Sequence, residues 1–394
     1  MDILVSGGSI AGPTLAYWLN RYGFKVTLVE RASELRLGGQ NIDVKGPALE
    51  IVRKMGLEDK IRAANTTEVG LRFVNIKNET VGEFPKESAF SMTQDLEILR
   101  GDLVKILYDH TKDDVTYVFG DYITGIDQTP EKVSVTFSSG KNEFYDFVIS
   151  AEGIGSKTRG LMFKNKIEFN YLGIYTAYFT VKRTDTDSRW ARWCNTKGGI
   201  VFMLRPDKYG TTRASITFLS PEAGYEKLSL AEQKDVLIKK IQDVGWEADR
   251  LVVEIKDSED LYFDRVSQVK ASTWHIGRVA LTGDAAYCAT PIAGKGVDLS
   301  MSGAYILAGE LSKNSDHQTA FENYENRMRK YVESSQKLPP GIPGIVYPTS
   351  KTGVAVLNGI VSLVASKPVM LFMGLFNKKD QKVQREIELP DYDG

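Results

Sequence analysis

The amino-acid sequence predicts an α/β fold in which a Rossmann-like nucleotide-binding domain is interleaved with a mixed-sheet domain and followed by a C-terminal helix. Residues 3–30 fit a strand, a glycine turn, a helix and a second strand, which is the opening of a βαβ unit. Between about residues 171 and 265, long β-rich runs replace this pattern. The chain then returns to the first domain, because a short apolar strand leads through a glycine turn to a helix near residue 296.

The first half of the chain interleaves the two domains. Strands are expected at residues 68–76, 80–84, 115–119, 133–137 and 144–150, and helices at residues 47–55 and 101–110. No long linker separates these elements. We therefore expect the nucleotide-binding domain to span residues 1–170, with strands of the second domain at about residues 68–100.

The second half contains the mixed sheet, expected over residues 171–270. Strands are predicted at residues 171–182, 199–204, 211–218 and 251–255. One helix is predicted from Ser229 to about residue 244, because Ser229 and Glu232 have the spacing of a capping box. Residues 271–338 are expected to complete the nucleotide-binding domain.

Residues 339–394 are predicted to form a C-terminal helical segment. A Pro- and Gly-rich stretch at residues 339–344 ends the preceding helix, and residues 354–376 are strongly apolar. Lys367 and Pro368 interrupt that run, which leaves fewer than the roughly 18 to 20 apolar residues that a membrane span needs. We expect a helix packed over the body of the protein rather than stable membrane insertion.

Composition favours a globular protein with a small-molecule ligand. The 394 residues contain 50 Lys and Arg against 51 Asp and Glu, a net charge of -1, which gives no reason to expect nucleic acid as a partner. Cys194 and Cys288 are the only cysteines, and the three histidines lack the spacing of metal ligands. No basic segment followed by an apolar one opens the chain. We expect a cytoplasmic monomer without a metal centre.

The glycine turn at residues 7–12 predicts a dinucleotide site. Gly7 and Gly12 let the backbone approach a pyrophosphate at the N-terminus of the following helix. Ser9 replaces the middle glycine of the G-x-G-x-x-G pattern. Glu30 ends the second strand, where a carboxylate can accept hydrogen bonds from ribose hydroxyls. Arg31, the next residue, is also predicted to bind the cofactor. The alternative is a glycine-rich turn without a ligand.

A second constellation points to flavin. Residues 278–286, with Pro291 and residues 294–298, closely resemble the second FAD signature of the para-hydroxybenzoate hydroxylase-like (class A) monooxygenases. The resemblance implies that Asp284 binds the ribityl chain of FAD. It also implies that the backbone of Gly294, Gly296 and Val297, at a helix start, faces the flavin pyrimidine. The alternative is a buried aspartate that caps a helix.

Further segments extend the resemblance over roughly residues 1–330. Arg100 matches the family arginine that contacts FAD, although it could instead be a surface residue. Residues 147–159 match the family's Asp-Gly segment, associated with FAD and NAD(P)H, with Glu152 in place of the usual aspartate. Residues 36–44 resemble tetracycline-inactivating monooxygenases (tetracycline destructases), which implies that Arg36 binds NADPH and Asp43 binds FAD. The C-terminal helix resembles one that closes the substrate site in some of them.

The resemblance implies an FAD-dependent monooxygenase that uses NADPH and O2 to oxidise a polycyclic, polyoxygenated aromatic compound, with tetracycline as the first candidate. Arg213, on the polar face of its strand, and Arg192 are candidate substrate residues, although either could be solvated. No residue is predicted to act as a general acid or base. Two alternatives stay open, namely an aromatic-metabolite hydroxylase of the same fold and a flavoprotein that sequesters a ligand without turnover.

Overall fold

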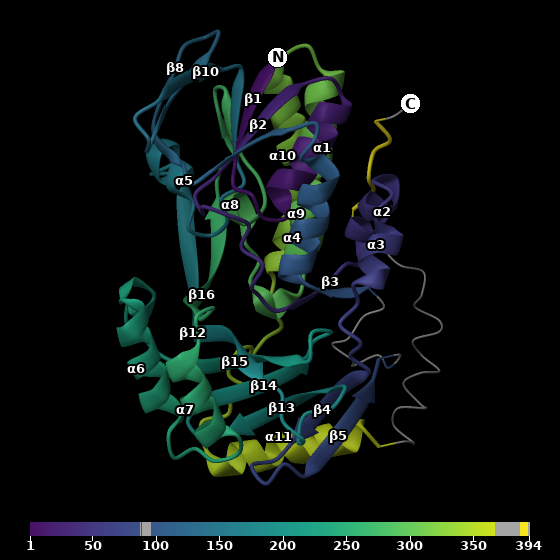
Figure 1. The fold of residues 1–394 in the computed structure, drawn as a ribbon, viewed down its shortest axis with the longest axis vertical. Helices are drawn as coiled ribbons and strands as arrows, with labels where there is room; N and C mark the ends of the chain where they lie inside the picture. Colours follow the sequence, from purple (N-terminus) through teal and green to yellow (C-terminus); the bar gives the residue numbers. More distant parts are fainter. Residues whose placement is uncertain (87, 89–95, 367–386, 393–394) are drawn as a thin grey trace.

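The computed structural model describes residues 1–86, 88, 96–366 and 387–392 (Figure 1). Its first sheet has the strand order β17-β18-β11-β1-β2-β7. The strands are β1 (Asp2–Ser6), β2 (Lys25–Glu30), β7 (Thr116–Phe119), β11 (Phe147–Ser150), β17 (His275–Ile276) and β18 (Val279–Leu281). All neighbouring pairs are parallel except β17 with β18. Because helices cover a parallel sheet, its central strands are almost continuously apolar and buried.

Four long helices pack together beside this sheet. They are α1 (Ala11–Arg21), α4 (Arg100–Thr111), α9 (Gly296–Lys313) and α10 (His317–Gln336). A three-stranded sheet of β8 (Ile123–Gln128), β9 (Val133–Phe137) and β10 (Asn142–Tyr145) lies on the other side in Figure 1, with α5 (Lys157–Met162) near it. This arrangement is the Rossmann-like half of the predicted fold.

The second sheet is mixed, as predicted, with the order β16-β12-β15-β14-β13-β4-β5. Its strands are β4 (Gly70–Val74), β5 (Thr80–Pro85), β12 (Ile167–Lys182), β13 (Trp190–Thr196), β14 (Ile200–Pro206), β15 (Thr211–Leu219) and β16 (Tyr262–Ala271). Only β4 and β13 run parallel as neighbours. Because β4 and β5 precede β7 and β11 in the chain, the two halves are interleaved as expected.

One face of the second sheet is covered by α6 (Leu230–Ile241) and α7 (Ala248–Asp257). The predicted capping box is present, since the Ser229 side chain accepts the Glu232 N–H and the Glu232 carboxylate accepts the Ser229 N–H. The strand predicted at residues 251–255 was wrong, because these residues lie in α7. Ala248, Leu251 and Ile255 recur at helical spacing and are buried against the sheet, so packing outweighed the β-branched residues between them.

Smaller elements connect the two halves. They are β3 (Asn41–Asp43), which pairs with β6 (Glu97–Leu99), the helices α2 (Gly46–Lys54), α3 (Glu58–Ala63) and α8 (Asp284–Tyr287), and two 3-10 turns at Tyr225–Lys227 and Pro291–Ala293. The sequence did not predict β8, β13 or β16 as separate strands. The exact domain limits stay predictions.

The C-terminal segment contacts both halves. Helix α11 (Lys351–Val364) lies along β5 and β13, at the lower end of Figure 1. Residues 367–376 of the predicted helix lie outside the described residues. The last described residues return to α9, where the Tyr392 phenol donates to Glu310 Oε1 at 2.6 Å and the Tyr305 phenol donates to the Pro390 carbonyl at 2.8 Å. Among the described residues, no helix is long and apolar enough to cross a membrane.

Gly309→Ala is expected to weaken this C-terminal contact. A Cβ at Gly309 would lie 2.1 Å from the Tyr392 ring, whereas a Cβ at Gly359 in α11 would meet no atom within 4 Å. We expect Gly309→Ala to lower the free energy of unfolding by about 1–3 kcal/mol, as overpacking does, and Gly359→Ala to leave it equal or slightly higher. Urea unfolding measures both. Equal stability of the two variants would contradict the contact.

Candidate functional site

The turn between β1 and α1 can close only with glycine at its ends. A Cβ on Gly12 would lie 1.9 Å from the Gly7 carbonyl oxygen, and a Cβ on Gly7, whose φ is +113°, would lie 2.4 Å from the Ala151 carbonyl oxygen. The turn is therefore pressed against the end of β11. Since the first N–H groups of a helix have no partner within it, the start of α1 can bind an anion.

Glu30 stands beside this turn at the end of β2. Its Oε2 accepts the Gly8 N–H at 2.7 Å, and its Oε1 accepts the Ala32 N–H at 2.9 Å. A carboxylate offers about four acceptor positions, so Glu30 can still accept from two hydroxyls. Arg31, the next residue, is exposed.

Arg100 joins the turn to the loop that carries Arg36. Its guanidinium donates to Ser9 Oγ at 3.3 Å, to the Arg36 carbonyl at 3.0 Å and to the Gly38 carbonyl at 2.5 Å. Burial, and then the charge of the exposed Arg36, lower the pKa of Arg100. Two repelling guanidinium groups beside a helix start favour an anionic ligand.

Asp284 reaches the same place from β18. Gly283 has a φ of +61°, and a Cβ there would lie 3.1 Å from Ala11 Cβ, so α8 begins directly against the start of α1. Burial raises the pKa of Asp284, while a hydrogen bond from Cys288 and the charge of Arg159 oppose the rise. The buried Arg159 donates to the Ala285 carbonyl at 2.9 Å, which fixes α8.

Asp43 lies near the start of α9. Its Oδ2 is 3.7 Å from Lys45 Nζ, and a Cβ on Gly294 would lie 4.0 Å from the same Nζ atom. Asp298 accepts the Ala48 N–H at 3.1 Å and so holds α2 against α9. Asp43 Oδ1 is buried with no hydrogen-bond partner among the described residues, and burial raises the pKa of this carboxyl. The structure thus brings Asp43 close to residues 294–297, where Gly294 and Gly296 are exposed and Val297 is buried.

Glu152, which replaces the family aspartate, already has a full set of donors. Its carboxylate accepts from Ser6 Oγ at 2.5 Å, Ser156 Oγ at 2.7 Å, and the Thr158 hydroxyl and N–H at 2.7 and 3.0 Å. Four hydrogen bonds use the acceptor positions of a carboxylate. Glu152 therefore ties the end of β1 to α5, and no acceptor position is left for a further ligand.

The two candidate substrate arginines lie on opposite faces of the second sheet. Arg192 is on the face covered by α6 and α7, is 3% exposed, and pairs with Asp187 at 2.5 Å and Glu247 at 2.7 Å. This placement corrects the expectation that Arg192 meets a ligand. The sequence could not show on which face of the sheet Arg192 lies, because β13 was not predicted as a strand. Arg213 lies on the other face, where its Nε is 3.0 Å from Asp207 Oδ2.

We call the face of the second sheet that carries Arg213 the Tyr178 face. Four residues lie side by side on it, on the adjacent strands β12, β15, β14 and β13: Tyr178, Ser215, Met203 and Trp193. Tyr262 extends the row on β16 and pairs with Tyr178. Sequence reasoning missed Tyr178 and Tyr262. The polar alternation of β15 was visible, but which residues of β12 and β16 lie beside it depends on register between distant segments.

A buried charge cluster joins the Tyr178 face to β3 and β6. Arg205 donates to Glu68 at 2.9 and 3.0 Å and also to Glu97, which accepts from Asn41 at 3.1 Å. Burial raises the pKa of Glu97 to about 7, the Arg205 charge opposes this rise, and Glu68 adds to it. The cluster fixes the strand that ends at Asp43.

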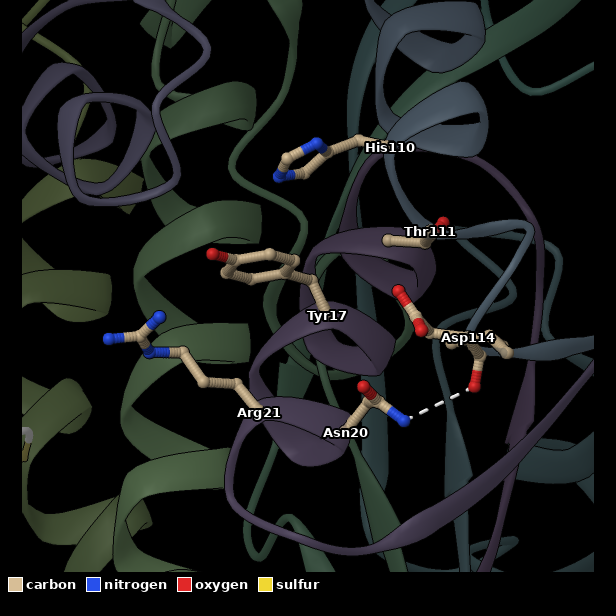
Figure 2. Close-up of a pocket in the computed structure, with 7 residues that line it drawn as sticks. Tyr17, Asn20, Arg21, His110, Thr111 and Asp114 are labelled. Atoms are coloured by element: carbon tan, nitrogen blue, oxygen red, sulfur yellow. Dashed lines mark hydrogen bonds between the residues drawn. The ribbon is translucent and has the colours of Figure 1, made fainter.

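A small cavity of about 120 Å³ lies elsewhere, between α1 and α4 (Figure 2). Tyr17 and His110 stack there with ring centroids 5.0 Å apart, and Asn20 donates to the Asp114 carbonyl at 3.2 Å. None of the predicted site residues lines it. Within the described ranges, no cluster of His, Cys, Asp and Glu could hold a metal ion.

Comparisons with known proteins agree with this geometry. The FAD binding domain family matches residues 1–335. A flavin-dependent monooxygenase of Legionella longbeachae serogroup 1 (strain NSW150) is 38% identical over 340 residues, covering 86% of this chain and 87% of the relative. The flavin-dependent monooxygenase eupH of Phoma sp is 34% identical over 427 residues, covering 100% of this chain and 98% of the relative.

Solved structures share the whole architecture. The tetracycline destructases Tet(51) and Tet(55) have TM-scores of 0.81 and 0.82 and identities of 33% and 34%, and each comparison covers 99% of this chain and 98% of the other. Klebsiella pneumoniae HpxO, complexed with FAD and uric acid, has a TM-score of 0.73 at 19% identity over 95% of each chain, which shows a common fold.

Glu152→Gln is expected to destabilise the protein. The amide has one acceptor oxygen, so several of the hydroxyls that donate to Glu152 lose a partner, at a cost of about 1–3 kcal/mol in the free energy of unfolding. Glu168→Gln, an exposed change in β12, is the matched control and should stay within about 0.5 kcal/mol of wild type. Chemical denaturation compares them. Equal stability would show that the Glu152 contacts contribute nothing.

Glu97 is expected to make stability depend on pH. Its folded pKa of about 7 lies above the ordinary 4.5, so between these values the folded state binds more protons than the unfolded state. The contribution of Glu97 to the stability of the folded state is therefore full below about pH 4.5 and is lost as the pH rises towards 7. Thermal unfolding from pH 5 to 8 should show Glu97→Gln gaining stability relative to wild type as the pH rises. Parallel profiles would contradict the assignment.

Proposed function

Because this chain belongs to the FAD binding domain family and is an FAD-dependent monooxygenase, we propose that it uses NADPH and O2 to hydroxylate or oxidatively inactivate a polycyclic, polyoxygenated aromatic compound. Tetracycline antibiotics are the first substrates to test, since Tet(51) and Tet(55) are named tetracycline destructases. We also propose that the protein acts as a cytoplasmic monomer.

One observation carries the cofactor part of the proposal, namely that Gly283 packs against Ala11 and so brings Asp284 to the start of α1. The donors and acceptors there suit the successive parts of FAD. The helix start, Ser9 and Arg100 suit the pyrophosphate, and Glu30 suits the ribose. Asp284 suits the ribityl hydroxyls, while Asp43 and the backbone of residues 294–297 suit the polar edge of the flavin ring.

When bound, FAD supplies the redox chemistry that couples NADPH oxidation to O2 activation. The residues of the chain bind and orient the reactants. The start of α1 and the Arg100 charge hold anionic phosphate, and the Tyr178 face positions the substrate. Tyr347 and Val346 pack on Ile174 and Val201 of that face, so the C-terminal segment shields part of it from water. We assign no residue as a general acid or base.

Arg36 is the proposed contact for NADPH. It is exposed and lies close enough to Arg100 for its charge to act on that guanidinium. Glu152, the other residue that the resemblance connected with NAD(P)H, has no acceptor position to spare. An exposed cation on a loop can bind the additional phosphate that distinguishes NADPH from NADH.

An aromatic-metabolite hydroxylase of the same fold is the second candidate. The comparisons do not rank it below tetracycline oxidation, because the flavin-dependent monooxygenase eupH is as similar to this chain as Tet(55), at 34% identity, and matches the whole chain. Ligand sequestration without turnover, the third alternative from the sequence, would consume no NADPH and is not favoured, because the relatives are named monooxygenases.

The decisive assay follows tetracycline absorbance with the protein, FAD, NADPH and O2, and then weighs the product. We expect NADPH consumption that depends on tetracycline, and a product that has gained oxygen. Consumption stimulated by simple phenols, with tetracycline unchanged, would favour the aromatic-metabolite hydroxylase. Absence of flavin binding at any FAD concentration would refute all three readings.

Asp284→Ala is expected to weaken FAD binding with the fold kept. Hydrogen bonds to a charged group contribute about 1.5–3 kcal/mol, which corresponds to a roughly 10- to 150-fold higher dissociation constant. Titration of the apoprotein with FAD, followed by flavin fluorescence, gives the constant. Asp249→Ala, an exposed change in α7, is the control. An unchanged constant for Asp284→Ala would remove Asp284 from the site.

A further inference from the structure

Two tyrosines lie where the cofactor residues meet the second sheet. Tyr262 is the first residue of β16, an edge strand of the second sheet, and its side chain is 48% exposed. Helix α8, which begins at Asp284, packs against β16. A Cβ on Gly38, whose carbonyl accepts from Arg100, would lie 3.8 Å from the Cβ of Asp260, two residues before Tyr262. Tyr262 therefore stands beside the residues proposed to bind FAD, although β16 belongs to the other sheet.

The Tyr262 ring continues into an aromatic surface. Tyr178 stacks beside it, with ring centroids 6.3 Å apart and an angle of 27° between the ring planes. Beyond Tyr178, Thr176 Oγ1 is 3.0 Å from Thr217 Oγ1, and Tyr347 of the C-terminal segment packs with Ile174 on the same face. The rings of Tyr262 and Tyr178 and the hydroxyls of Thr176 and Thr217 thus share the face on which the C-terminal segment packs.

The orientation of Tyr262 is fixed by its own strand. Its phenol donates to Asp264 Oδ2 at 2.9 Å, and Asp264 Oδ1 accepts the Arg265 N–H at 2.7 Å. The two arginines of the face are already paired, Arg205 with Glu68 and Glu97, and Arg213 with Asp207 at 3.0 Å. The ring surface is therefore suited to stacking and neutral hydrogen bonds rather than to binding a charged group.

From this juxtaposition we propose that Tyr262 and Tyr178 are specificity-determining residues, which position a planar, hydroxylated aromatic substrate by stacking beside the FAD. Asp264 is a positioning residue that holds the Tyr262 phenol. The inference rests on the proposed function, because it presupposes FAD at Asp284. Beyond the proposed function, Tyr262 and Tyr178 are the residues that recognise the substrate, and stacking is the interaction by which they do so.

The test uses the FAD-loaded protein and two probe ligands, tetracycline and the planar dihydroxyanthraquinone alizarin. Ligand binding is followed through the change in flavin absorbance. Loss of a stacking ring contributes about 0.5–1.5 kcal/mol beyond its area, so Tyr262→Leu and Tyr178→Leu should raise the ligand dissociation constant by about 2- to 10-fold. Tyr262→Phe keeps the ring and should restore most of the affinity.

Controls separate recognition from stability. Phe144→Leu changes a ring that is 67% exposed on β10, outside the Tyr178 face, and should leave ligand binding unchanged. FAD affinity should be the same in all these variants. Asp264→Asn should weaken ligand binding less than Tyr262→Leu does.

The outcomes distinguish the inference from the function on which it rests. Unchanged ligand affinity in both leucine variants overturns the inference while FAD binding and turnover stand. A wild-type protein that binds FAD but neither probe also overturns it, because the inference commits to planar hydroxylated ligands. Failure to bind FAD overturns the proposed function, and the inference with it.

Discussion

The site can form only because Gly7 and Gly12 approach each other closely in the turn between β1 and α1. With no side chain at either position, the backbone can turn from β1 into α1 with the Gly7 carbonyl in contact with Gly12. That turn leaves the start of α1 open to an anion and brings Ala11 against Gly283. Arg100 and Asp284, from segments far apart in the chain, are positioned around this one helix end.

The second sheet is placed relative to this helix end by buried polar contacts rather than by a continuous apolar core. Arg205 reaches from β14 to Glu68 and Glu97, and Asn41 links the same cluster to β3. Such a cluster is costly to bury, but the pairing of Arg205 with both carboxylates fixes one geometry. The Tyr178 face is thereby held towards the residues proposed to bind FAD.

Local patterns were predictable, and contacts between distant segments were not. The β1–α1 turn and the Ser229 capping box each depend on a few consecutive residues, so the sequence predicted both. The face of Arg192 depends on the pairing of β13 with β4 and β14, and the proximity of Tyr262 to Tyr178 depends on a register between residues 84 positions apart. Similarly, α7 became a helix because Leu251 and Ile255 pack on the sheet, which residues 251–255 alone could not indicate.

The glycine turn is proposed to bind the anionic pyrophosphate of FAD, and titration of Gly12→Ala with FAD is the direct test of that role. A methyl group there would lie 1.9 Å from the Gly7 carbonyl, whereas one at Gly160 in α5 meets no atom within 4 Å. We expect wild type and Gly160→Ala to bind one FAD per chain, and Gly12→Ala, with its circular dichroism spectrum unchanged, to lose binding. Wild-type FAD affinity in folded Gly12→Ala would contradict that role.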